Sequence, residues 1–453
     1  MIATKQVTST EVIESHLGRI EDVNGHLNAV VRVLADEARL AAKQADATVA
    51  TGEALGVLHG VPFTVKENID VAGTPTTSGL IALAGALADS DAPTVERLRS
   101  AGAIPIGRTN LPDLGLRVTT ESSLHGITKN PWNPDVTAGG SSGGEASALA
   151  SGMSPLGLGN DLGGSLRNPA HCCGVASIKP TTGRVPWATV VGPQDMVLGF
   201  QQMAVEGVMA RTVADVRLGL SVVAGQHVRD PLSQPVPLQN QYTGRPLSVA
   251  LLATPPGGAT DPGIAGVVRS AADRLADAGY DVVEVTPPSY ERVLALWQSL
   301  VMVEIRQQLP LLDMVMGDDA KRFLHMAKET RPDIDLTTFL NEQVERFAIT
   351  RAWDGFFAEH QLIVSPVWAQ PAFPHGFDVQ SVENAEATFE LMRPILPANY
   401  LGLPAAVVPG GLADGMPVGV QVIGGRWSEY DCLDAAEVIQ QAIGMLTPID
   451  PRR

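Results

Sequence analysis

The chain has 453 residues, of which 45% are hydrophobic, so it is long enough to bury a large core and is expected to be globular. Its formal net charge of −17 argues against direct binding to nucleic acid or to an anionic membrane. Three cysteines without metal-ligand spacing fit a reducing compartment, and no segment has the pattern of a signal peptide or a membrane span. We therefore expect a cytoplasmic protein.

The N-terminal hundred residues carry helix signals followed by a strand signal. Thr8 and Glu11 form a capping-box pattern, which predicts a helix that ends at residues 24–25. A second, alanine-rich helix is predicted over about 36–49. The next segment, VLHGVPFTVKENID, is typical of a strand, and its Pro62 favours an edge or a bend of a sheet.

The first of two serine-bearing glycine clusters is GGSSGGE, at residues 139–145. Ser142 and Glu145 form another capping-box pattern, so Ser142 is the predicted cap of a short helix. Ser141 then lies on a glycine-flanked turn with a hydroxyl that is free for another role. A purely structural role, in which both serines satisfy backbone donors, is an equal alternative at this point.

The second cluster, GNDLGGSLR at residues 159–167, follows a short strand signal, SPLGLG. The successive N–H groups of Leu162, Gly163, Gly164 and Ser165 are expected to converge on one anion, which is how an oxyanion hole is made. The positive end of a following helix would favour an alkoxide at Ser165. An acyl-transfer nucleophile needs this arrangement.

A serine nucleophile also needs a group that accepts its proton. The nine histidines lack a recognisable partner motif, and a serine–lysine pair is the alternative. Lys66 closes the apolar run of the predicted strand, and burial would lower its pKa enough to give a neutral amine. Taken alone, however, a lysine after a strand is usually a solvated strand end.

Three other motif readings are weak. Gly139–Gly143 fits the G-x-S-x-G pattern, but the preceding NPWNPDVTA is a poor core strand. GLGNDLGG misses the dinucleotide fingerprint by one residue, and no G-K-[ST] follows any glycine run. We expect no cofactor and no metal.

The C-terminal half returns to an α/β pattern after a polar, proline-containing surface crossing at about 225–245, which is expected to separate two lobes. LSVALLA, IAGVVRSAADRLADAG and YDVVEV predict a strand, a helix and a strand. Residues 289–360 are mainly helical and are expected to cap the sheet. The strands LIVSPV, AAVVP and PVGVQVIG and a helix over about 429–443 complete the chain.

These segments resemble the amidase signature family. GGSSGGE, GNDLGGSLR and the following KPTTGRVP carry the resemblance, together with GVPFTVKENIDVAGTPTTSG before them and GLPAAVVPGGLADGMPVGVQVIGG near the end. The resemblance covers nearly the whole length. It implies one amidase signature domain over residues 1–453, with an α/β fold whose mixed central β-sheet is covered by helices on both sides.

The resemblance also implies a Ser-cisSer-Lys triad. Ser165 would attack the carbonyl carbon, Ser141 would relay the proton after a cis peptide bond from Gly140, and neutral Lys66 would be the base. Asn160 stands where the family has a small hydroxyl residue, and we expect this departure not to touch the triad.

Other residues receive supporting roles from the same resemblance. Residues 162–165 become the oxyanion-hole donors, as the residues alone had suggested. Asp161 and Arg167 are implied to support the loop, and Ser142 is implied to lie near the hydrogen-bond network. Arg184 is either a structural anchor, the preferred role, or a group near the leaving side.

The predicted activity is hydrolysis of the C–N bond of an amide, an anilide or a carbamate (urethane) through an acyl-enzyme. The apolar segment at 187–205 and the helical cap predict a hydrophobic pocket for an aryl or alkyl substrate. The alternative is the glutamine-hydrolysing subunit of a tRNA-dependent amidotransferase; a non-catalytic relative is a third. The expected partner is a small-molecule amide or carbamate, and a homodimer is left open.

Overall fold

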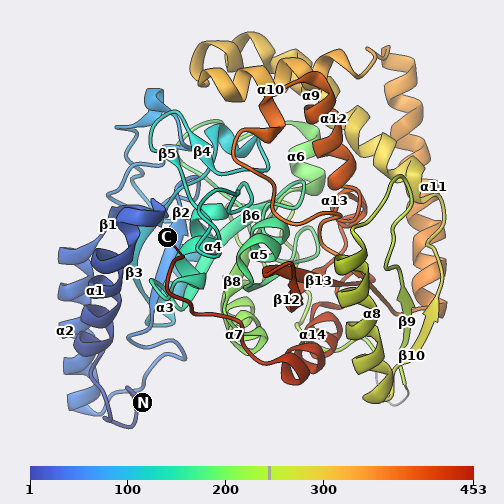
Figure 1. Cartoon of the computed structure of the whole chain (residues 1–453). Coiled ribbons are helices and arrows are strands. Elements are labelled where there is room, and N and C mark those ends of the chain that lie inside the picture. Colours follow the sequence, from blue (N-terminus) through green and yellow to red (C-terminus); the bar gives the residue numbers. More distant parts are fainter. Residues whose placement is uncertain (243–245, 453) are drawn as a thin grey trace.

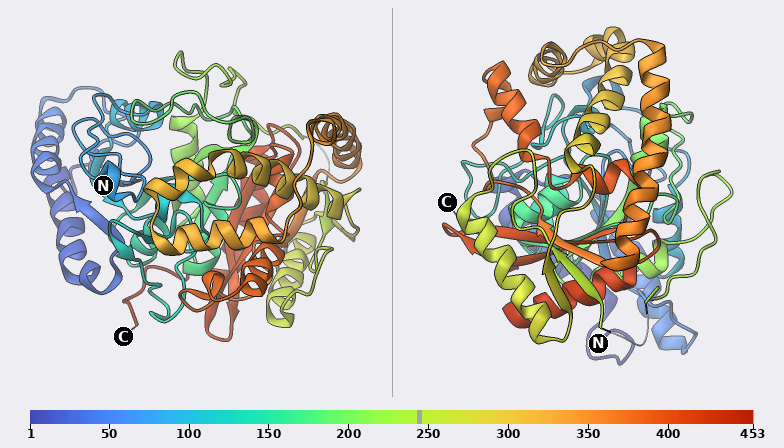
Figure 2. Two further views of the ribbon diagram at one scale, coloured as in Figure 1. Left: turned by 90° about the horizontal axis from the view of Figure 1, so that it is seen from above. Right: turned by 90° about the vertical axis from the view of Figure 1, so that its right-hand side faces the viewer.

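One large mixed sheet runs through the molecule, with helices on both sides of it (Figures 1 and 2). The structure is a computed structural model that describes residues 1–242 and 246–452. Across these residues, eleven strands pair in the order β1 (Val30–Val33), β3 (Ile104–Thr109), β2 (Pro62–Lys66), β6 (Leu156–Asp161), β8 (Val205–Ala210), β7 (Ala176–Lys179), β12 (Ala405–Ala413), β13 (Met416–Gly424), β11 (Leu362–Pro366), β9 (Ser248–Leu251) and β10 (Asp281–Glu284). The sheet contains both parallel and antiparallel pairs, so the predicted mixed sheet is confirmed.

The two N-terminal helices, α1 (Ser9–Leu27) and α2 (Ala35–Thr51), pack beside β1 and β3. The Thr8–Glu11 capping box is confirmed, but the predicted end of the helix is wrong. Asn24 does not stop α1, because its side-chain oxygen accepts the N–H groups of Ala29 and Val30 beyond the helix. The helix therefore continues to Leu27.

The strand β2 is not an edge strand, contrary to the prediction from its proline. It pairs in parallel with β3 on one side and with β6 on the other. Pro62 is its first residue, a position where proline is tolerated because the ladder needs no N–H there. Lys66 is its last residue, as predicted.

The strands on either side of the predicted surface crossing join the same sheet. β9 and β10 are parallel, with α8 (Pro262–Asp277) between them, and β9 also pairs with β11. The segment at 225–245 therefore does not divide the sheet into two lobes; its residues 243–245 lie outside the described part of the chain. The last predicted helix is observed as α14 (Glu429–Ile443).

The predicted helical region consists of α9 (Tyr290–Val315), α10 (Asp318–Glu329) and α11 (Leu336–Glu359), which lie along one side of the molecule in yellow and orange (Figures 1 and 2). Buried side chains of α9 and α10 join one apolar cluster with residues of the second serine loop, such as Leu166. The remaining elements are α3 (Pro93–Ser100), α4 (Gly143–Ala150), α5 (Arg167–Cys173), α6 (Leu198–Met203), α7 (Val213–Val223), α12 (Val382–Leu391), α13 (Leu396–Tyr400), the pair β4 (Glu121–Ser122) and β5 (Gly126–Ile127), and three short 3₁₀ turns. No helix within the described ranges is both long and apolar enough to cross a membrane.

Candidate active site

Lys66 lies at the centre of a buried polar group. Its side chain is fully buried, and its Nζ lies 2.7 Å from the Oγ of Ser141. The alternative of a solvated strand end is therefore wrong. Burial lowers the pKa of Lys66 to about 7, although the nearby carboxyl groups of Asp161, Glu145 and Glu206 act in the opposite direction. Near neutral pH a substantial fraction of this lysine is an uncharged amine that can accept a proton.

Ser141 lies on a tight loop that brings its hydroxyl to Lys66. The Gly140–Ser141 peptide bond is cis, as the resemblance implied. Gly140 has no room for a side chain, because a Cβ there would lie 2.6 Å from the backbone of Thr119. The glycine cluster therefore allows close approach to a neighbouring loop, and Ser141 itself is only 2% exposed.

The predicted capping box at the next residue is correct in position and wrong in its hydrogen bonds. α4 begins directly after Ser142, but the Ser142 side chain makes no capping bond and instead contacts the carbonyl oxygen of Asn160 at 3.4 Å. Glu145 points into the protein, where it accepts hydrogen bonds from Thr64 and Thr109. α4 is buried on all sides, so the carboxyl finds partners on β2 and β3, and burial raises the pKa of Glu145 to about 8.

The second serine loop is held by Asp161, the last residue of β6. Its carboxylate accepts the N–H of Gly164 at 2.8 Å and the N–H of Leu166 at 3.1 Å. It also forms a fully buried ion pair with Arg167, at 3.1 Å, and accepts a bond from Asn399. Burial alone would raise the pKa of Asp161, but Arg167 holds it well below its usual range. The geometry agrees with the supporting role implied for both residues.

The predicted set of four oxyanion donors is reduced to three by this contact. The N–H of Gly164 is already bonded to Asp161. Within the described part of the chain, the N–H groups of Leu162, Gly163 and Ser165 have no hydrogen-bond partner. These three donors lie at the end of β6, where the chain turns toward α5. They remain available for a carbonyl oxygen of a substrate.

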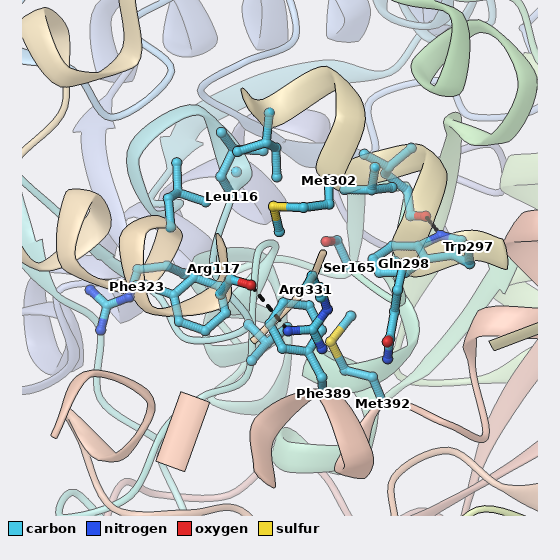
Figure 3. A pocket seen from close by; sticks show the side chains of 18 residues that line it. Leu116, Arg117, Ser165, Trp297, Gln298, Met302, Phe323, Arg331, Phe389 and Met392 are labelled. Atoms are coloured by element: carbon cyan, nitrogen blue, oxygen red, sulfur yellow. Dashed lines mark hydrogen bonds between the residues drawn. The ribbon is translucent and has the colours of Figure 1, made fainter. Parts of the chain in front are cut away.

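Ser165 stands on the wall of a cavity, 8% exposed. Its carbonyl oxygen accepts the N–H of Ser142 at 3.2 Å, so the two serine loops are joined directly through their backbones. Its hydroxyl has no hydrogen-bond partner among the described residues, and Figure 3 shows it pointing into the open space. The polar interior around Lys66 therefore meets the cavity at this side chain.

The cavity is mostly apolar and is closed by the helical region (Figure 3). Its lining consists of Gly115, Leu116, Arg117, Val118, Leu162, Gly163, Ser165, Trp297, Gln298, Val301, Met302, Ile305, Phe323, Leu324, Ala327, Arg331, Phe389 and Met392. The prediction that the helical cap contributes to a hydrophobic pocket agrees with this lining. The contribution expected from residues 187–205 is wrong, because that segment lines a different cavity with Arg229 and Asp230.

Arg184 lies away from the cavity. It is fully buried, forms an ion pair with Glu429 at 3.0 Å and lies over the ring of Trp427 at 4.7 Å. Its guanidinium also donates to the carbonyl oxygen of Pro237. These contacts tie the segment after β7 to the start of α14 and support the anchor role.

Asn160 is the main residue that sequence reasoning missed. We expected it not to touch the triad, but its side-chain oxygen lies 2.6 Å from the Nζ of Lys66. The contact arises because β2 and β6 are neighbours in the sheet, so their ends meet. Only the strand order, which the sequence does not show, could have indicated it.

A family model described as Amidase matches residues 11–433. The chain belongs to the amidase signature family. An indoleacetamide hydrolase from Bradyrhizobium diazoefficiens is 41% identical over 448 residues, which cover 98% of this chain and 85% of the relative. A glutamine-dependent relative, the amidase-type component of the glutamyl-tRNA(Gln) amidotransferase from Chloroflexus aggregans, is 32% identical over 469 residues, covering 97% of this chain and 94% of the relative.

Among solved structures, a bacterial aryl acylamidase of the amidase signature family superposes on this amidase with a TM-score of 0.81. The two share 28% identity, and the match covers 99% of this chain and 95% of the acylamidase. The predicted family and fold are thereby confirmed. The predicted class of reaction, hydrolysis of amide C–N bonds other than peptide bonds, is confirmed with them.

Proposed function

We propose that this amidase hydrolyses small amides that carry an aryl or alkyl group, through an acyl-enzyme on Ser165. The observation that carries the proposal is the buried hydrogen bond of 2.7 Å between the Nζ of Lys66 and the Oγ of Ser141. It lies beside a loop that presents the Ser165 hydroxyl to an apolar cavity. A base, a hydroxyl and a nucleophile are then available next to a place where a hydrophobic substrate fits.

In the first half of the reaction, the Ser165 oxygen attacks the carbonyl carbon of the amide. Its proton passes to the Ser141 oxygen, and the Ser141 proton passes to the neutral amine of Lys66. The carbonyl oxygen becomes an oxyanion, which the N–H groups of Leu162, Gly163 and Ser165 stabilise. The C–N bond then breaks, the leaving nitrogen takes the proton back from Lys66 along the same path, and an ester remains on Ser165.

In the second half, water replaces the amine. Lys66 accepts the proton of the water through Ser141 as the water oxygen attacks the ester carbon. When the second tetrahedral intermediate collapses, the bond to the Ser165 oxygen breaks and that oxygen regains its proton. The products are a carboxylic acid and an amine or ammonia, and Lys66 is neutral again.

The cavity favours apolar substrates over a charged amino acid. The charged residues that line it are Arg117 and Arg331. Arg117 is held by Asp378 at 2.9 Å, and Arg331 is paired with Glu386 at 3.0 Å and lies over the ring of Phe389. Each cation already has a carboxylate partner, so the cavity offers no free cation of its own lining to the carboxylate of glutamine.

The indoleacetamide hydrolase supports the same choice, since the two chains are 41% identical. We therefore infer that arylacetamides are the first substrates to test. The amidotransferase component, at 32% identity, keeps glutamine hydrolysis as the second candidate. Activity on carbamates, a homodimeric state and a cytoplasmic location stay predictions.

The test is a substrate panel with the purified chain alone. Phenylacetamide, indole-3-acetamide, a nitroanilide, an aryl carbamate, an aryl ester and glutamine are compared by kcat/KM, with Ser165→Ala measured in parallel. The proposal expects turnover of the aryl amides and its loss in Ser165→Ala. Turnover of glutamine alone, and only with an added partner protein, would establish the amidotransferase function instead.

A further inference from the structure

Lys66 has a second close contact besides Ser141. Its Nζ donates to the side-chain oxygen of Asn160 at 2.6 Å, and the Asn160 amide nitrogen donates to the side-chain oxygen of Asn68 at 2.8 Å. Asn160 is 6% exposed and Lys66 is fully buried. The two amides and the lysine therefore form a continuous hydrogen-bonded chain that ends at the Ser141 hydroxyl.

The chemistry of these groups gives the chain a direction. A neutral amine has two N–H donors and one lone pair, whereas an amide oxygen can only accept. Asn160 therefore takes one N–H of Lys66 and does not compete for the lone pair. A small hydroxyl residue at this position can also donate to the amine, and its hydroxyl would then compete with that of Ser141.

Asn68 determines which end of the Asn160 amide faces the lysine. The amide nitrogen of Asn160 needs an acceptor, and the oxygen of Asn68 provides one two residues after Lys66 in the chain. With its nitrogen engaged there, Asn160 presents its oxygen to Lys66. The orientation of the lysine is thus fixed from outside the pair that it forms with Ser141.

We propose that Asn160 is a positioning residue for Lys66, which holds one N–H of the amine so that its lone pair faces the Ser141 hydroxyl, and that Asn68 fixes the orientation of the Asn160 amide. This inference rests on the proposed function, because it assigns Lys66 as the base. Neither asparagine lines the substrate cavity. Both are therefore expected to act on kcat and on its pH dependence.

Other ionisable groups around Lys66 define the setting of the test. Glu145 comes from α4, and Asp161 follows Asn160 on β6. Glu206 is the direct cross-strand partner of Asn160 on β8, and burial raises its pKa to about 8. No carboxyl group of these three is a hydrogen-bond partner of the lysine among the described residues. A carboxylate introduced at position 160 would be the first to contact the amine directly.

The decisive experiment is the pH profile of kcat/KM for Asn160→Asp on an aryl amide. A carboxylate in contact with Lys66 favours the charged amine, so the acidic limb of the profile should move to higher pH by about 1–3 units. Activity lost at neutral pH should return in alkaline buffer. Asn341→Asp on the exposed face of α11 adds the same charge elsewhere and should leave the profile unchanged.

Two further variants separate positioning from charge. Asn160→Leu keeps a similar volume without an acceptor and should lower kcat by about 100-fold at unchanged KM, because the base is no longer held in line. Asn68→Ala leaves Asn160 in place but frees its amide, and it should lower kcat less than Asn160→Leu. Circular dichroism and thermal unfolding of each variant identify any loss of fold, in which case the pH profile of Asn160→Asp decides.

The inference fails if Asn160→Asp keeps the wild-type pH profile or if Asn160→Leu keeps the wild-type kcat. Failure of the proposed function looks different. In that case the wild-type chain does not turn over aryl amides, or Ser165→Ala remains active. A wild type that needs Ser165 and is insensitive to position 160 would remove only the inference about Asn160 and Asn68.

Discussion

The polar interior beneath Ser165 and the apolar cavity above it are built from different parts of the chain. The interior comes from the ends of β2 and β6 and from the two serine loops, and its side chains have short, buried hydrogen bonds. The cavity is made largely by α9, α10 and α12, whose long apolar side chains come from residues 297–392. The first region provides groups for proton transfer, and the second provides shape for a substrate. The two can therefore be altered separately.

The largest expected effect comes from the residue at which the two regions meet. Ser165→Ala removes the nucleophile and should lower kcat by about 10⁴-fold or more at unchanged fold. The measurement is ammonia release from phenylacetamide, with circular dichroism on the same samples. Normal turnover by the variant would contradict the mechanism.

A change in the polar interior alone should remove the base and keep the cavity. Lys66→Met has similar length and no amine, and it should lower kcat by about 10²- to 10⁴-fold with little change in the binding of a product acid. Isothermal titration with phenylacetate checks the binding. A variant with wild-type kcat would exclude Lys66 as the base.

The pH dependence of the wild type is a milder test of the same region. Lys66 accepts a proton only when it is neutral, and burial lowers its pKa to about 7. The value of kcat/KM should therefore rise as the pH increases through about 7 and fall toward acid. A limb that rises only near the usual lysine pKa of about 10.4 would show that the base is not desolvated.

A change in the cavity alone should affect selectivity. Val301→Phe fills the space next to Ser165 and should lower kcat/KM for indole-3-acetamide by about tenfold while acetamide is still hydrolysed. Val344→Phe is the matched control, because Val344 is 72% exposed on α11 and does not line the cavity. Equal losses for both substrates would show that the cavity does not select the acyl group.

The smallest expected effect on activity comes from an ion pair outside both regions. Arg184→Met leaves the Glu429 carboxylate buried without its partner and should lower the free energy of unfolding by about 3–5 kcal/mol, with KM unchanged. Urea unfolding measures the first quantity and steady-state kinetics the second. A raised KM at unchanged stability would place Arg184 near the leaving group after all.

The sequence by itself determined the local features of this protein. The capping box of α1, the strand–helix–strand unit around α8, the last helix and the two serine loops are readable because each depends on residues that are close along the chain. The family motifs added the triad of Lys66, Ser141 and Ser165. The anchor role preferred for Arg184 also agrees with its buried contacts.

Tertiary structure decided how distant segments meet. The order of β2 and β6 brings Asn160 to Lys66, and the buried position of α4 turns Glu145 away from its cap toward Thr64 and Thr109. The carboxylate of Asp161 takes the N–H of Gly164 from the predicted oxyanion hole. A buried polar group bonds to whichever partner lies nearest in space, and strand order and packing decide which one that is.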